Sequence, residues 1–221
     1  MASMNLPTTT QVLEAAEHLP EGAALIVPQV SWDEYERVLE ALAPRHLRVS
    51  YDCGRLQIVS PLPEHERYSR FIEDLVLLYC QAFDITLEKL GSTTWKKRAL
   101  AKGAEPDCCY YVGNAKRIIG KRNLDLESDP PPDVVVEIDT TNSSLEKLII
   151  YAALRVQEIW RYDGETVTIY QLRKKEYVKV SQSPTLPEMT GELLAESLEL
   201  SKAQGQTAAR LSFQKRIRSL K

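Results

Sequence analysis

The sequence has few of the residues that usually hold transition metals or form disulfide bonds. It contains four cysteines and three histidines in 221 residues, and no two cysteines are in a CxxC spacing. Cys108 and Cys109 are adjacent, which suits neither a tetrahedral zinc site nor a disulfide framework. The histidines are too scattered for their spacing to indicate a zinc site. We therefore expect the cysteines to be buried thiols.

Long apolar runs are also missing. No segment reaches the roughly 18 consecutive apolar residues of a membrane-spanning helix. The first residues lack a basic stretch followed by an apolar one, which is the pattern of a secretory signal. Hydrophobic residues make up 43% of the chain and charged residues 27%, as is typical of a folded globular protein. We expect a cytoplasmic protein without a membrane partner.

The chain as a whole has no excess of positive charge, because its formal net charge is -3. Binding nucleic acid through the overall field requires clustered Lys and Arg that neutralise phosphates. Segment 91–122 is an exception, with eight basic residues against two acidic ones. Such a run is commonly just a solvated face. The alternative is that it contacts nucleic acid, and the residues we select for that contact are Lys96, Lys97 and Arg98.

Local patterns in the first third of the chain predict both helices and strands. Ser31 followed by Glu34 is a capping box, which predicts a helix over 31–42. Alternating residues around a Gly-containing turn predict a hairpin over 46–61. Apolar residues at helical spacing predict a long helix that begins near Pro63.

The rest of the chain also alternates between predicted strands and predicted helices. Strands are predicted near Asp107 and over 133–139, followed by a helix over 144–154. The dipeptide Asp163-Gly164 predicts a hairpin turn, and the residues after Pro187 are helical, ending in a basic tail that we expect to be a surface helix or a frayed end. Strands interleaved with helices indicate a mixed sheet with helices on its faces, an α/β or α+β fold.

The segment DVVVEID at 133–139 carries carboxylates in an otherwise apolar strand. Strand side chains alternate between faces, so Asp133, Glu137 and Asp139 share one face. If a helix covers that face, Glu137 is buried. An unpaired buried carboxylate is costly unless it is hydrogen-bonded, ion-paired or bound to a metal. Asp133 is expected to belong to the turn that starts the strand.

Nearby residues could offset the cost of burying the Glu137 carboxylate in two ways. If the strands pair, Asp107 reaches the same side of the sheet, and two carboxylates are enough to hold Mg²⁺ or Mn²⁺. Lys147, early in the next helix, could return its ammonium to the carboxylates. A metal and a lysine together would serve phosphodiester hydrolysis, the metal by activating water and the lysine by orienting it. The alternative is structural, with Glu137 and Lys147 as an ordinary ion pair and Asp139 capping the helix.

The runs EPDCCYYV and DPPPDVVVEIDTTNSSLEKLIIYAALRVQEIWRYDG resemble the Uma-type bacterial family of "putative restriction endonucleases" in the PD-(D/E)XK nuclease superfamily. The likeness also includes the hairpin YDCGRL and the PEH before the long helix. It implies an α/β, restriction-endonuclease-like fold with a mixed central sheet flanked by helices and an added N-terminal helix and hairpin. We divide the chain into an N-terminal extension (1–28), a nuclease-like domain (29–190) and a C-terminal helical tail (191–221).

The resemblance also implies roles for individual residues. Asp107 matches the acidic residue of the PD strand and Glu137 that of the next strand, which makes both metal ligands. The superfamily pattern has a lysine two residues after that glutamate, where this sequence has Asp139. Lys147 then replaces the lysine, and Asp139 is either an added metal ligand or a helix cap. His65 matches a histidine ahead of the long helix and is expected to line the site, the alternative being a core or surface histidine.

We consider three functions. The first is a Mg²⁺-dependent endonuclease acting on DNA, expected to be a homodimer because cutting both strands of a duplex generally needs two sites. The second is a nucleic-acid-binding or assembly module that keeps the nuclease fold without cleaving, which the absence of a lysine at position 139 favours. The third is a structural homodimer without a nucleic acid partner.

Overall fold

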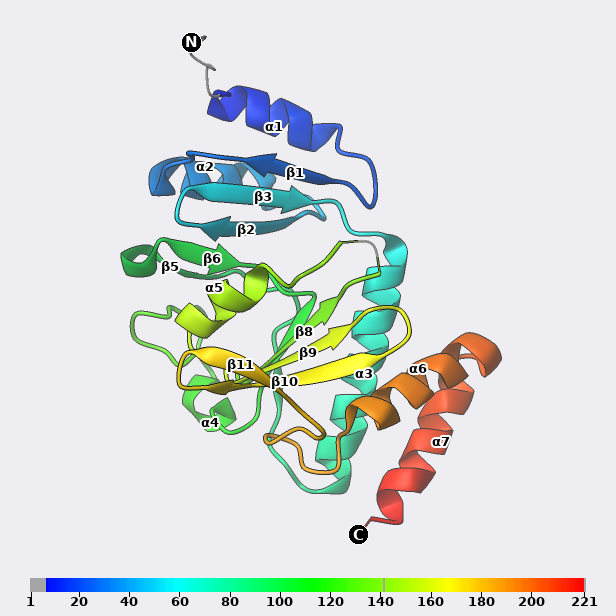
Figure 1. The fold of residues 1–221 in the computed structure, drawn as a ribbon. Helices are drawn as coiled ribbons and strands as arrows, with labels where there is room; N and C mark the ends of the chain where they lie inside the picture. The colour runs from blue at the N-terminus through cyan, green and yellow to red at the C-terminus, as the bar shows by residue number, and fades with distance from the viewer. Residues whose placement is uncertain (1–6, 141, 221) are drawn as a thin grey trace.

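The computed structural model describes residues 7–140 and 142–220. Residues 1–6 of the expected N-terminal extension and Lys221 of the basic tail lie outside this part. The described chain has an α/β fold in which two sheets lie one above the other, with helices packed around and between them (Figure 1). None of its helices is long and apolar enough to cross a membrane.

The first sheet is antiparallel, with five strands in the order β1-β3-β2-β6-β5. In chain order these are β1 (Ala24–Val27), β2 (Arg48–Asp52), β3 (Arg55–Val59), β5 (Trp95–Lys97) and β6 (Lys102–Ala104). Helices α1 (Thr9–Glu17) and α2 (Trp32–Leu42) cover one face of this sheet, and the 3-10 helix η1 (Arg98–Leu100) follows β5. β5, which carries Lys96 and Lys97, is only three residues long.

The capping box is confirmed at the start of α2. The backbone N–H of Glu34 donates to Ser31 Oγ (3.3 Å), and Ser31 N donates to Glu34 Oε2 (2.8 Å). Two backbone donors that the first helical turn leaves without partners are thereby satisfied.

The predicted hairpin is confirmed as β2 and β3, and its alternation sets up the site. Cys53 (φ 46°) and Gly54 (φ 98°) are both left-handed, as in the tight turns that match strand twist. Val49 and Leu56 point into the core beneath α2. Because side chains alternate, Arg48 and Gln57 project from the opposite face of the sheet.

The second sheet is mixed, with six strands in the order β11-β10-β9-β8-β7-β4. β8 runs parallel to β9, and the other pairs are antiparallel. Its strands are β4 (Glu88–Lys89), β7 (Cys108–Tyr111), β8 (Val134–Ile138), β9 (Glu158–Tyr162), β10 (Val167–Arg173) and β11 (Glu176–Val180). Cys108 lies opposite Val136, so the strand that follows Asp107 does pair with the strand that carries Glu137.

Helices cover both faces of β8, which buries the whole strand. α3 (Pro63–Ala82) packs on the face formed by Val134, Val136 and Ile138. α5 (Lys147–Ala153) packs on the other face and lies between the two sheets (Figure 1). The short helix α4 (Ala115–Ile118) follows β7.

One sequence-based expectation is corrected, because the helix expected over 144–154 begins only at Lys147. The residues after Pro187 form α6 (Gly191–Gln204) and α7 (Gln206–Arg218) on either side of Gly205. The basic tail is thus a surface helix, one of the two forms expected for it. Apolar residues four apart give α7 a stripe that packs in the same core as α3, formed by Ala209, Phe213 and Ile217.

Candidate active site

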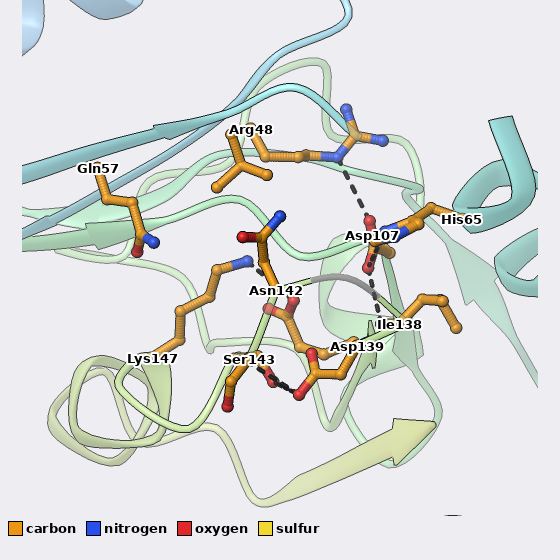
Figure 2. Close-up of a pocket in the computed structure, with 12 residues that line it drawn as sticks. Arg48, Gln57, His65, Asp107, Ile138, Asp139, Asn142, Ser143 and Lys147 are labelled. Carbon is orange, nitrogen blue, oxygen red and sulfur yellow. Dashed lines mark hydrogen bonds and ion pairs between the residues drawn. The ribbon is translucent and has the colours of Figure 1, made fainter. Parts of the chain in front are cut away.

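A pocket lies where the C-terminal end of β8 meets the polar face of the first sheet (Figure 2). One wall comes from β2 and β3. The other comes from β8 and the segment that leads into α5, and the first turn of α3 closes one side. The pocket is thus built from parts of the chain that are far apart in sequence.

Glu137 is held by two side chains of α5. Its carboxylate accepts from Lys147 Nζ at Oε2 (2.8 Å) and from the Tyr151 hydroxyl at Oε1 (2.5 Å). These two donors are four residues apart, so they lie on the same face of the helix. Lys147 Nζ also donates to the backbone carbonyl of Glu105 (3.3 Å). The expected proximity of Lys147 to the acidic strand is therefore present.

Burial controls the ionisation of this group. Glu137 is only 2% exposed. Loss of hydration raises the pKa of its carboxyl to about 7, although the Lys147 charge acts in the opposite direction. Burial also disfavours the charged form of Lys147, but Glu137 and Asp107 outweigh it and raise the pKa of the ammonium. Lys147 therefore stays protonated at neutral pH.

Asp107 lies just before β7 and contacts the end of β8. Its Oδ2 accepts from the backbone N–H of Ile138 (2.8 Å), one residue beyond Glu137. His65, in the first turn of α3, also lines the pocket, with Nδ1 4.0 Å from Asp107 Oδ2 and Nε2 3.0 Å from Thr140 Oγ1. The structure brings together the predicted residues Asp107, Glu137, Lys147 and His65.

Asp139 lines the pocket, but its carboxylate is engaged elsewhere. Its Oδ2 accepts from Ser144 N (2.9 Å) and Ser144 Oγ (3.0 Å), and it forms an ion pair with Arg161 of β9. The side chain is 1% exposed. Asp139 therefore fixes the turn that leads into α5, but it does not cap the helix itself, because Ser144 lies three residues before Lys147, where α5 begins without a side-chain cap.

The described residues contain no group of three or more His, Cys, Asp or Glu side chains arranged to hold a metal ion. The three metal ligands predicted from the sequence are therefore not assembled as one cluster. Asp107 and Glu137 remain as the two carboxylates on adjacent strands, with hard oxygen donors of the kind that Mg²⁺ and Mn²⁺ use.

The opposite wall contains residues that the sequence-based reasoning missed. Arg48 reaches in from β2, with Nε 3.7 Å from Asp107 Oδ1 and Nη2 donating to Glu66 Oε1 (3.0 Å). Gln57 of β3 and Asn142 also line the pocket, and Asn142 Nδ2 donates to the carbonyl of Gly22 (2.9 Å). The alternation of side chains in the hairpin predicts that Arg48 points away from the core. It does not predict which residues Arg48 meets on that side.

The basic residues selected for nucleic acid contact do not line the pocket. Lys96 pairs with Glu36 (2.7 Å), and Arg98 pairs with Glu36 and with Asp33. These acids belong to α2, which covers the face of the first sheet opposite to Arg48. Lys97 lies 3.4 Å from Glu127 Oε2, as measured from its Nζ.

The fold and the pocket define an α/β protein with a carboxylate and lysine site at the end of a central strand, the arrangement expected for a nuclease-like protein. A family model described as "Uma2: Putative restriction endonuclease" matches residues 32–203. The match spans well over half of the chain, and the chain therefore belongs to this family.

A solved structure from Anabaena variabilis ATCC 29413, titled as a "putative nuclease belonging to DUF820", is 16% identical to this chain. The similarity covers 67% of this chain and 89% of that one, with a TM-score of 0.45. A comparison with curated proteins gave no match.

Proposed function

We propose that this chain is a metal-dependent endonuclease that hydrolyses phosphodiester bonds of DNA. The observation that carries the proposal is the set formed by Asp107, Glu137 and Lys147, two buried carboxylates from adjacent strands and an ammonium held against one of them. The family description supports a nuclease, and a restriction endonuclease is an enzyme that acts on DNA.

The donor set fits a divalent cation with oxygen ligands. Asp107 and Glu137 would hold it. The backbone N–H of Ile138 donates to Asp107, and the N–H and C=O of a strand residue point the same way. The carbonyl oxygen of Ile138 is therefore directed to the side where Asp107 lies. Mg²⁺ or Mn²⁺ bound there would polarise a phosphate and lower the pKa of a bound water. Chemistry of this kind needs no thiol or histidine ligand.

The charge balance of the pocket agrees with an anionic substrate. Arg161 neutralises Asp139, so Asp107 and Glu137 are opposed by Arg48 and Lys147. Glu66 also pairs with Arg48, so these protein groups have no excess of positive charge, and a divalent cation would shift the charge of the pocket in favour of a phosphodiester.

Lys147 would act as a donor rather than as a base. Since its pKa is raised, the ammonium cannot accept a proton from water near neutral pH. It can orient an attacking water and stabilise the negative charge that develops on the phosphate. His65, 4.0 Å from Asp107 and next to Thr140, would help to position the Asp107 carboxylate.

The test is cleavage of supercoiled plasmid in Mg²⁺ or Mn²⁺ by the wild type and by Asp107→Asn, Glu137→Gln and Lys147→Ala. Circular dichroism and urea unfolding would show whether each variant is folded. We expect the wild type to nick the plasmid and each folded variant to lose about 100-fold or more in rate. Wild-type rates in a folded Asp107→Asn or Glu137→Gln variant would refute the metal-site proposal.

A second function is favoured by Asp139, which stands where the superfamily pattern has its lysine. The chain would then bind nucleic acid without cleaving it. This alternative expects no cleavage in any metal, together with DNA binding that Asp107→Asn leaves unchanged.

We also propose that the active form is a homodimer. One chain carries one copy of the set Asp107, Glu137 and Lys147, which can cut one strand at a time. Light scattering on the eluted protein would give its oligomeric state, and a monomer that only nicks would refute this proposal.

A further inference from the structure

One buried cation of the pocket is not explained by the proposed metal site. The Arg48 side chain is 10% exposed, and its guanidinium lies beside Asp107 (Figure 2). Nη2 donates to Glu66. Nε is buried and has no hydrogen-bond partner among the described residues. Buried polar groups are normally hydrogen-bonded, so the unpaired Nε–H of Arg48 can donate to a further acceptor in the pocket.

Asp107 does not accept a hydrogen bond from Arg48 Nε. Nε is 3.7 Å from Asp107 Oδ1, too far for a hydrogen bond. The other carboxylate oxygen already accepts from Ile138 N. Glu66 is half exposed, with a side-chain exposure of 47%, so its pairing with Arg48 is open to solvent and easily exchanged.

The position of Arg48 is fixed by the hairpin rather than by the carboxylates. Val49 and Tyr51 anchor β2 in the core beneath α2, and alternation then directs Arg48 to the pocket. Gln57 lines the same wall, because it lies two residues before Val59, the residue of β3 that pairs with Arg48. A rigid strand therefore presents a planar, permanently charged group across the pocket from Glu137 and Lys147.

We propose that Arg48 binds a phosphate oxygen of the nucleic acid backbone in the pocket. A guanidinium donates two parallel hydrogen bonds to phosphate, a geometry that lysine cannot reproduce. This inference rests on the proposed function and extends it, because it makes the first sheet one half of the substrate site. The carboxylates of the second sheet and the arginine of the first sheet would then lie on either side of the substrate phosphate.

The test measures binding separately from cleavage. Thymidine 3′,5′-bisphosphate and a fluorescein-labelled DNA duplex serve as probes in Ca²⁺, which takes the same oxygen ligands as Mg²⁺. We expect Arg48→Gln to lose about tenfold or more in affinity for both probes, and Arg48→Lys to recover part of it. Arg45→Gln is the control, because Arg45 is exposed and pairs with Glu17 away from the pocket. We expect it to bind as the wild type does.

A second variant keeps the test decisive if Arg48→Gln does not fold. Glu66→Gln frees Arg48 from its partner and should raise the affinity for the bisphosphate by a few-fold. Glu64→Gln removes the same charge from the same turn of α3 and should raise it less. Equal effects of Glu66→Gln and Glu64→Gln would contradict the proposal.

The outcomes separate this inference from the proposed function. If the wild type binds the probes through Arg48 but cuts no plasmid, the phosphate site stands and the endonuclease does not. If the wild type cuts and Arg48→Gln binds and cuts equally well, Arg48 is only a structural partner of Asp107 and Glu66. Failure of the wild type to bind either probe overturns the inference.

Discussion

At the residue scale, the most unusual group is a carboxyl that is buried against a lysine and a tyrosine. Glu137, Lys147 and Tyr151 form a closed polar set inside an otherwise apolar layer between α5 and β8. Removing one member of such a set is more costly than replacing all of it, because the remaining charge is left buried and unpaired. The same burial makes Glu137 sensitive to pH.

The first prediction concerns that pH sensitivity in the metal-free protein. The folded pKa of Glu137 is about 7, against 4.5 for an ordinary glutamate. Between these values the folded protein holds a proton that the unfolded chain has lost. The free energy of unfolding therefore falls as pH rises through this range, by up to about 3 kcal/mol.

Urea unfolding in EDTA across that range measures the effect, with Glu137→Gln as the control. A carbon-13 titration of the Glu137 side chain gives its pKa directly. A midpoint near that of an ordinary glutamate would show that Glu137 is better solvated than the structure indicates.

The second prediction separates the two roles of Asp139. Asp139→Asn leaves the Arg161 guanidinium without its partner in a largely buried place and should cost about 2 to 3 kcal/mol of unfolding free energy. Its Mn²⁺ affinity should stay near that of the wild type, whereas Asp107→Asn should weaken it strongly. Calorimetry measures the affinity and urea unfolding the stability. A comparable loss of Mn²⁺ affinity in both variants would make Asp139 a metal ligand after all.

At the element scale, helix caps and alternating strands were predicted well because they depend on neighbouring residues. The capping box of α2 and the turn of the β2 and β3 hairpin are examples. The late start of α5 was not predicted. Asp139 binds Ser144 and holds residues 144–146 outside the helix, a contact that also depends on Arg161 of another strand.

The third prediction concerns the contact between α6 and β10. A Cβ at Gly191 would lie 2.1 Å from the carbonyl oxygen of Val167, so the helix and the strand would have to separate. Gly191→Ala should lower the free energy of unfolding by about 2 kcal/mol. Gly113→Ala is the matched control, since its Cβ would meet Asp133 at 3.7 Å, an ordinary contact. Similar urea unfolding curves for the two variants would contradict this close approach.

At the scale of the whole molecule, charge is divided between two faces of the first sheet. The side that carries Arg48 faces the pocket, whereas Lys96 and Arg98 lie on the side of α2 with their acidic partners. Lys96 and Arg98 of the basic run are therefore paired with acidic side chains of α2.

The fourth prediction tests that distribution. The triple variant Lys96→Gln, Lys97→Gln and Arg98→Gln should bind the DNA duplex within about twofold of the wild type, because these cations are already paired and are screened at moderate salt. The slope of affinity against salt concentration should also stay the same. A large loss of affinity with a shallower slope would show that these residues contact phosphates, which was the alternative to a solvated face in the sequence analysis.

The sequence by itself predicted the main strands and helices around the pocket. Strand alternation and helix spacing, which are local rules, indicated that Asp107, Glu137 and Lys147 lie near one another, and the resemblance to a nuclease family gave them their expected roles. Tertiary structure decided which segments meet. The pairing of β7 with β8 brings Asp107 to Glu137, and the first sheet, whose polar face meets the end of β8, adds Arg48 to the pocket. Contacts between residues tens of positions apart depend on how sheets and helices pack, and no local pattern encodes that packing.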